Sequence, residues 1–288
     1  MKLAMPIKAA LAASSLALLA ACGGGSADAT MTVTPALGAV YNADVNVYNA
    51  TGQLVGTGTT GTAGTVDLSM YGSITAPLAV VVTANANTTY FNEKTGANEA
   101  LATGTNMMTV APSARASVGV SALTTMAAKM AGVTPGNVRA SMTSVTKDKI
   151  DTGVSKTLAV LGLSGVTAAY DLFQATTPAK DANWASSLSG FSLLVANISK
   201  AATGTPAEQL KAFDDAVDSD GKIVAAAATT FTALNTQLKT VSIPNVTIQT
   251  VTEVSEAAIS TLAEAIKTAV STVTAGGTAT GATAATGS

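Results

Sequence analysis

The first third of the chain alternates hydrophobic and polar residues with a period of two. Val45 and Val47 alternate with Asp44 and Asn46, which is the pattern of a half-buried strand. Residues 49–52 then supply a turn of Asn, Ala, Thr and Gly. Similar strand signals recur at residues 53–55, 65–68, 78–82 and 107–110. This spacing predicts an antiparallel β-sandwich over residues 28–116.

From about Ser121 the hydrophobic period lengthens to between three and four, which is typical of amphipathic helices. Thr205-Pro206-Ala207-Glu208 has the form of a capping box with proline at the first helical position, so a helix is expected to begin there. A last helix is expected over residues 247–274. The hydrophobic stripes that support these and neighbouring helices include Leu123, Met126, Met130, Val154, Leu158, Trp184, Leu188, Phe191, Val195 and Ile198.

The predicted fold class is therefore α+β in two domains. An N-terminal antiparallel β-sandwich, Ig-like or transthyretin-like, precedes an all-α helical bundle over residues 117–274. Residues 275–288 are rich in Gly, Ala and Thr without periodicity, and we expect them to be disordered.

A short apolar leader stands before the first domain. Lys2 and Lys8 flank its start, and its apolar stretch is too short for a permanent membrane helix, so residues 1–21 indicate a cleaved signal peptide. It ends in Leu19-Ala20-Ala21-Cys22. This ending resembles the lipobox of exported bacterial lipoproteins. The resemblance implies lipidation of Cys22, a membrane partner through that anchor, and passage to the outer membrane because Gly rather than Asp follows the cysteine.

The interpretation of these residues as a lipid anchor and a tether has an alternative. Residues 22–27 begin with the cysteine and three glycines, which indicates a flexible tether between lipid and folded chain. An ordinary signal peptide, with a cysteine that happens to follow the cleavage site, is the competing interpretation. The expected location is the cell envelope, as an outer-membrane lipoprotein that is surface-exposed or faces the periplasm.

The amino-acid composition restricts the partners and reactions expected of this chain. Charged residues make up 11% and the formal net charge is −2, which disfavours nucleic acid as a partner. Histidine is absent and Cys22 is the single cysteine, so disulfides, thiolate or imidazole metal sites and catalysis by His or Cys are excluded. We therefore predict a protein without cofactor that is not an enzyme.

A hydrolase using Asp, Glu, Ser and Lys is the least favoured alternative. Ser144 and Lys147 have the Ser-x-x-Lys spacing, and Lys94-Thr95-Gly96 spells a second element of the penicillin-binding set. Their order along the chain is reversed and the Ser-Asp-Asn element is missing. Asp214 and Asp215 are adjacent, so on a helix they do not face each other as a glycosidase pair does.

The order of features between Gly38 and Ala84 resembles the carboxypeptidase-regulatory-like, transthyretin-type sandwich of bacterial surface proteins. The matching pieces are residues 38–40, 43–48, 57–59 and 64–68, together with Gly52. The family's Thr-Asp-x-x-Gly turn is replaced by Thr-Gly-Thr-Ala-Gly at residues 60–64, and a generic immunoglobulin-like module is the alternative. The resemblance implies a spacer or recognition element, and not a peptidase.

The helical part is similar to the region that follows immunoglobulin-like modules in some betaproteobacterial surface lipoproteins. The matching pieces are residues 120–128, 161–164 and 215–223. No chemistry is attached to this resemblance.

Candidate binding residues are few. A stacking surface for a glycan or an apolar small molecule is expected from aromatic side chains, namely Tyr41, Tyr48, Tyr90, Phe91 and Trp184. Asp218 and Asp220 resemble half of a calcium loop, but Ala216 and Ala227 stand where its first and last ligands belong, so no metal site is predicted.

The predicted function is non-covalent recognition or structural support in the cell envelope, with surface adhesion or assembly ranked first and an envelope protein or glycan as partner. Capture of a glycan or apolar small molecule in the periplasm is the alternative. An open aromatic-lined cleft would favour capture, and flat faces rich in Thr and Asn would favour adhesion.

Overall fold

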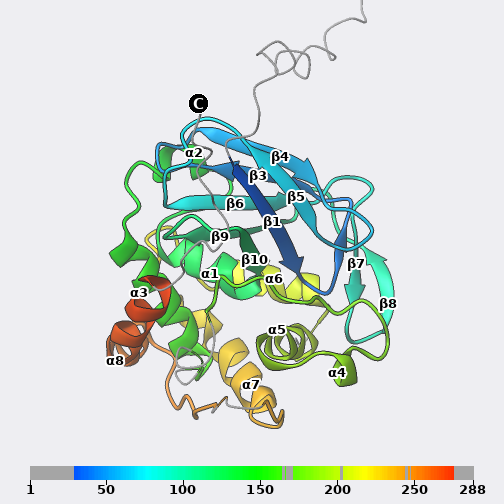
Figure 1. Cartoon of the computed structure of the whole chain (residues 1–288). Helices are drawn as coiled ribbons and strands as arrows, with labels where there is room; N and C mark the ends of the chain where they lie inside the picture. Colours follow the sequence, from blue (N-terminus) through cyan, green and yellow to red (C-terminus); the bar gives the residue numbers. More distant parts are fainter. Residues whose placement is uncertain are drawn as a thin grey trace, which may run out of the picture.

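The structure, a computed structural model, describes residues 29–163, 166, 171–201, 204–243, 246 and 248–275. The predicted signal peptide, the Cys22 motif with its tether, and the tail beyond residue 275 lie outside these ranges. Figure 1 shows a curved sheet at one end of the molecule and helices packed beneath it.

The larger sheet follows the order β10-β1-β5-β4-β3-β6-β9. Its strands are β1 (Ala29–Ala36), β3 (Asp44–Tyr48), β4 (Leu54–Thr59), β5 (Val66–Met70), β6 (Leu78–Thr83), β9 (Asn106–Ala111) and β10 (Ser117–Ser121). The strand pattern read from the sequence is confirmed at β3, where Val45 and Val47 are buried. A second, smaller sheet has the order β2-β7-β8, with β2 (Val40–Tyr41), β7 (Thr89–Asn92) and β8 (Ala97–Ala100).

The prediction of an antiparallel β-sandwich is wrong. β1 and β10 run parallel, with Val33 opposite Val118, whereas the other neighbours in the larger sheet are antiparallel. The sheet is mixed and curls into a nearly closed, barrel-like form. The hydrophobic period missed this because it shows which side chains face the core, but not which strand lies beside which.

Helices follow the sheet directly. They are α1 (Ala122–Met130), α2 (Val138–Ser141), α3 (Lys147–Val160), α4 (Trp184–Ser187), α5 (Gly190–Lys200), α6 (Pro206–Asp215), η2 (Ala225–Ala227), α7 (Ala228–Leu238) and α8 (Glu256–Ala275). The capping box expected at the start of α6 is confirmed: Glu208 N–H donates to Thr205 Oγ1, and Thr205 N–H donates to a Glu208 carboxylate oxygen. Among the helices of the described ranges, none combines the length and apolar character that a membrane crossing requires.

Both edges of the larger sheet are covered by later parts of the chain. On β9, the Met108 N–H donates to Thr125 Oγ1 at 3.0 Å, and Thr124 Oγ1 donates to the Met108 carbonyl at 2.9 Å. On β10, the Gly119 N–H donates to the Phe173 carbonyl at 2.9 Å. An uncovered edge offers unpaired backbone groups, so these bonds complete the sheet.

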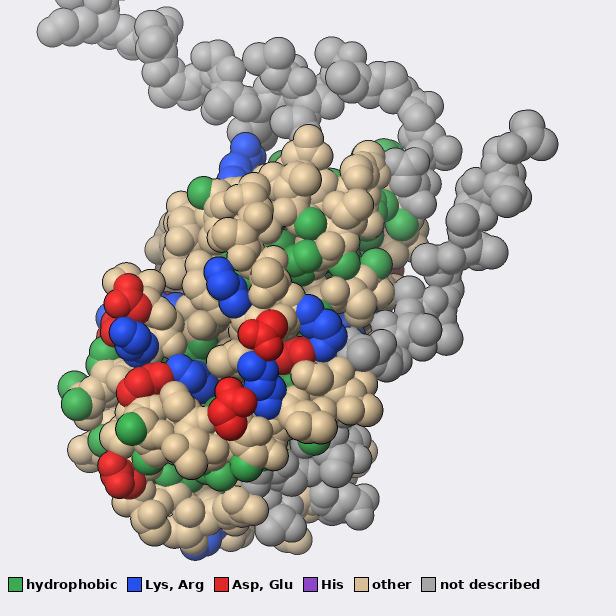
Figure 2. Space-filling model, turned by 90° about the vertical axis from the view of Figure 1, so that its left-hand side faces the viewer, with side chains coloured by type: hydrophobic (Ala, Val, Ile, Leu, Met, Phe, Trp, Pro, Cys, Tyr) green, Lys and Arg blue, Asp and Glu red, His purple; other side chains and the backbone are tan. Residues whose placement is uncertain are grey.

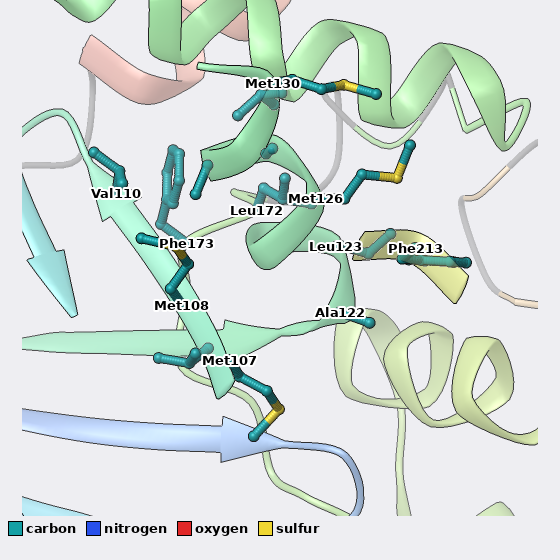
Figure 3. Close-up of a cluster of buried hydrophobic side chains, with 14 of the residues drawn as sticks. Met107, Met108, Val110, Ala122, Leu123, Met126, Met130, Leu172, Phe173 and Phe213 are labelled. Carbon is teal, nitrogen blue, oxygen red and sulfur yellow. The ribbon is translucent and has the colours of Figure 1, made fainter. Parts of the chain in front are cut away.

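Sheet and helices share one hydrophobic core. Figure 3 shows Met107, Met108 and Val110 of β9 in the same cluster of buried side chains as Leu123 and Met126 of α1. The same cluster of buried side chains continues from Met31 in β1 to Val270 in α8. The domain boundary predicted at residue 117 falls before β10, the strand that leads without interruption into α1.

Candidate functional site

The aromatic residues predicted to stack on a ligand are distributed over separate places. Phe91 and Trp184, 2% and 4% exposed, meet in a small buried cluster with Ala179, Leu188 and Ala196. Tyr90 is buried, and its hydroxyl donates to Glu99 Oε2 at 3.0 Å. Tyr48 lies half-buried under the Arg139 guanidinium, 5.7 Å from its ring centroid. Together with half-buried Tyr41 on β2, they line no common cleft among the described residues.

The calcium-like fragment is a closed turn. Asp218 Oδ1 accepts the backbone N–H groups of Asp220 and Lys222, both at 2.9 Å. These bonds, with that of Lys222 first, hold the pKa of Asp218 below its usual value. Nowhere in the described ranges do three His, Cys, Asp or Glu side chains gather where they could hold a metal ion.

The serine, lysine and aspartate residues considered for hydrolysis do not converge. Lys147 pairs with Asp151 at 2.5 Å, and Ser144 Oγ donates to the carbonyl of Ser141. Lys94 Nζ donates to the Gly204 carbonyl, on another part of the molecule. Asp214 pairs with Lys129.

A buried acid lies where the β7–β8 hairpin meets α5. Glu93 is 5% exposed, and its Oε2 has no hydrogen-bond partner. Burial raises the pKa of Glu93 to about 8, against the opposing effect of backbone N–H groups that include Gly38. Thr176 Oγ1, also unpartnered, lines the same slit of about 170 Å³, in which no point accepts a water-sized sphere. The slit therefore holds a protonated acid at neutral pH but has no room for a ligand.

A wider groove of about 670 Å³ lies between α6, α7 and the end of α5, and we call it the α6–α7 groove. Small or apolar residues form much of its wall, and its lining residues are Ala201, Gly204, Glu208, Gln209, Ala212, Thr229, Thr230, Ala233 and Leu234. Gln209 is 5% exposed and its amide oxygen has no hydrogen-bond partner.

Local sequence explains why the groove exists. Phe213 and Phe231, with ring centroids 5.6 Å apart, hold α6 and α7 together, while alanines at 212 and 233 leave space between them. At the rim, a Cβ on Gly204 would lie 2.1 Å from Glu208 Oε2, so a larger residue there would displace the carboxylate from its capping-box bond to Thr205. Sequence reasoning located the capping box but missed Gln209, because a glutamine on a helix gives no signal that its amide will be buried.

Comparison with known proteins assigns no function to this groove. No family model, no curated protein and no solved structure matches the chain. The resemblances to lipoproteins and to transthyretin-type modules therefore stay predictions from the sequence.

Proposed function

We propose that this chain is a lipid-anchored protein of the cell envelope that captures a small apolar molecule. The capture site is the α6–α7 groove. The observation that carries the proposal is the groove itself, which has a volume of about 670 Å³ and a wall made largely of small or apolar residues.

The groove suits such a ligand in size and chemistry. Its volume of about 670 Å³ lies in the range of small-molecule sites, which combine an apolar wall with a few polar groups. Glu208 at the rim disfavours an anionic ligand.

The anchor supports the envelope location. Lipidation of Cys22 with two or three acyl chains would hold the protein on a membrane without a membrane-spanning helix. Surface adhesion or assembly, ranked first from the sequence, stays a prediction. The groove favours capture, although its lining contains no aromatic residue of the kind expected for stacking.

Binding in the groove is tested with N-phenyl-1-naphthylamine, a fluorescent apolar molecule with a single N–H donor. The wild-type protein should bind it with saturable enhancement of fluorescence. Gln209→Met should bind the probe as the wild type does, because the Gln209 amide oxygen is shielded from solvent and cannot contact a ligand in the groove. Ala233→Trp should abolish binding by filling the groove.

The matched control is Ala265→Trp, which places the same bulky residue at an exposed alanine on α8, outside the groove. It should bind the probe as the wild type does. Equal binding by the wild type and Ala233→Trp would reject the groove as the capture site.

The anchor is tested separately by mass spectrometry of the mature amino terminus and by membrane fractionation. A diacylglyceryl group on Cys22 is expected, and Cys22→Ser should release the protein into the soluble fraction. An unmodified thiol on a soluble protein would reject the anchor, whatever the result of the probe experiment.

A further inference from the structure

We infer that one end of the larger sheet lies against the lipid surface, with Tyr71 and Arg139 as its contact residues; this rests on the lipid anchor of the proposed function. We call this end the tether end. It consists of the turn 49–53, the loop 71–77 and α2, which surround the start of β1.

Strand register places these pieces together. Ala29 at the start of β1 pairs with Met70 at the end of β5, so Tyr71 follows directly beside the point where the described chain begins. The Ala50 N–H donates to the Thr75 carbonyl at 3.0 Å, which joins the turn to the loop. A Cβ on Gly52 would lie 2.0 Å from the Arg139 carbonyl, so α2 packs closely on the same turn. Figure 1 shows α2 and the start of β1 at the same upper end of the molecule.

The length of chain between Cys22 and β1 limits how far the tether end can lie from the membrane. Only seven Cα-to-Cα steps separate Cys22 from Ala29. A fully extended chain spans at most about 3.5 Å per residue, so an acylated Cys22 keeps the start of β1 within about 25 Å of the lipid layer. The opposite end, where α7 lies in Figure 1, has no such restraint from the anchor.

The surface chemistry of the tether end fits a lipid headgroup layer. Tyr71, 52% exposed, is the one large hydrophobic side chain that is exposed among the described residues. Tyrosine is favoured at membrane interfaces because its ring is apolar and its hydroxyl is polar. Arg139, above the Tyr48 ring, adds a cation nearby for lipid phosphates.

Acidic groups are missing from the same segments. Residues 49–53 and 71–77 contain no Asp, Glu, Lys or Arg, and residues 134–143 contain Arg139 as their single charge. The loop 112–116 at the same end of the sheet contains Arg115, whose charge is paired with Asp171. The face drawn in Figure 2 shows the contrast, since its charged side chains gather over the middle and lower parts and only sparsely over the upper part. Anionic headgroups would repel an acidic surface, so the tether end is the end that a membrane accepts.

The test uses the full-length lipidated protein in vesicles of phosphatidylethanolamine and phosphatidylglycerol at 3:1. Because Cys22 is the single cysteine and its sulfur carries the proposed diacylglyceryl group, an introduced cysteine can be labelled alone with a nitrobenzoxadiazole fluorophore. Thr75→Cys places the label in the exposed part of the loop 71–77. Thr232→Cys, exposed on α7, is the matched control.

Spin-labelled lipid should quench the fluorophore at position 75 at least threefold more than the one at 232. Adding Tyr71→Ser and Arg139→Ser to Thr75→Cys should at least halve that difference. Equal quenching at 75 and 232, in protein that floats with the vesicles, would overturn the orientation and leave the anchor intact. Undiminished quenching after the two serine changes would overturn the contact by Tyr71 and Arg139. Protein that carries no lipid on Cys22 and does not float would overturn both the anchor and the orientation.

Discussion

The sheet region and the helical region use charge in different ways. Residues 29–121 contain six charged side chains, at positions 44, 67, 93, 94, 99 and 115. The helices that follow carry many more, and several of these fasten one helix to another. Lys156 pairs with Glu256, and Lys267 pairs with Asp148 at 2.9 Å, so both bridges join α3 to α8.

The difference follows from how each region is held in place. A strand in the sheet is joined to its neighbours by backbone hydrogen bonds, and its register is set by its apolar side chains and by the turns, so it needs no ion pairs to hold its place. A helix satisfies its backbone internally, so its position depends on side chains alone. The stripe on α8 is made of Ile and Val among Ala and Thr, and the ion pairs help to fix where that shallow stripe docks.

The largest expected effect comes from the region with fewer charges. The pKa of Glu93 is about 8 in the folded protein, against an ordinary value of 4.5 in the unfolded chain. The folded state therefore retains a proton that the unfolded state releases. The part of the stability that depends on Glu93 should therefore be complete below pH 4.5 and should be lost as the pH rises to 8, by at most about 5 kcal/mol. Urea unfolding of the wild type and Glu93→Gln at pH 5 and pH 8.5 measures this.

Glu93→Gln should flatten the pH dependence because it cannot ionise. Glu99→Gln is the control on the same hairpin. Hydrogen bonds, first from Asn92 and then from Thr95, lower the pKa of Glu99, so it titrates below this window. A wild-type stability that stays constant from pH 5 to 8.5 would contradict the assignment.

The second effect concerns the shared core. Leu123 of α1 is 1% exposed and packs in the cluster of Figure 3. Leu123→Ala should lower the free energy of unfolding by about 3 kcal/mol. Because one core joins sheet and helices, circular dichroism and Trp184 fluorescence should report a single transition. Two separate transitions, with only one of them shifted, would show that the regions fold independently.

A smaller effect is expected at the α3–α8 ion pair. Glu256 accepts from Lys156 Nζ, from Ser260 Oγ at 2.9 Å and from the Ile223 N–H at 2.9 Å. Glu256→Ala leaves these donors without a partner and should cost about 2 kcal/mol in chemical denaturation at pH 7. Asp215→Ala removes the exposed pair with Lys211 and should leave the denaturation midpoint within experimental error of the wild type, because water screens this pair.

The pH dependence at Glu256 has the opposite sign to that at Glu93. Although burial opposes ionisation, hydrogen bonds led by Lys156 leave the pKa of Glu256 lower than usual. Its contribution is therefore present above pH 4.5 and is lost as the pH falls through the folded-state pKa.

Similar losses for Glu256→Ala and Asp215→Ala at pH 7 would contradict the role given to the α3–α8 pair.

The smallest effect is a gain in the helical region. Gln209→Met replaces a buried unpartnered amide oxygen by a thioether, so the free protein should become more stable by about 1 kcal/mol or less. Thermal unfolding without ligand measures it. A marked loss of stability would mean that the Gln209 amide supports the fold.

Local patterns predicted elements well and their assembly poorly. The alternation at Val45 and Val47 and the capping box at Thr205 are properties of neighbouring residues, and both appear in the structure as expected. The stripe from Trp184 to Ile198 is buried, but it is divided between α4 and α5 because Leu188 is extended and Gly190 has a φ of 56°. Phe91 and Trp184 are far apart in the chain, and only folding could show that they pack against each other.

The sequence by itself determined the strand and helix signals, the scarcity of charge near the amino terminus, and the absence of histidine. Tertiary structure alone decided that β10 lies parallel to β1, that Glu93 loses its contact with water, and that Gln209 lines a groove between helices. The physical reason is the distance along the chain over which each interaction acts. Periodicity and capping depend on residues a few positions apart, whereas strand partners, desolvation and cavities depend on residues that approach only when the chain is folded.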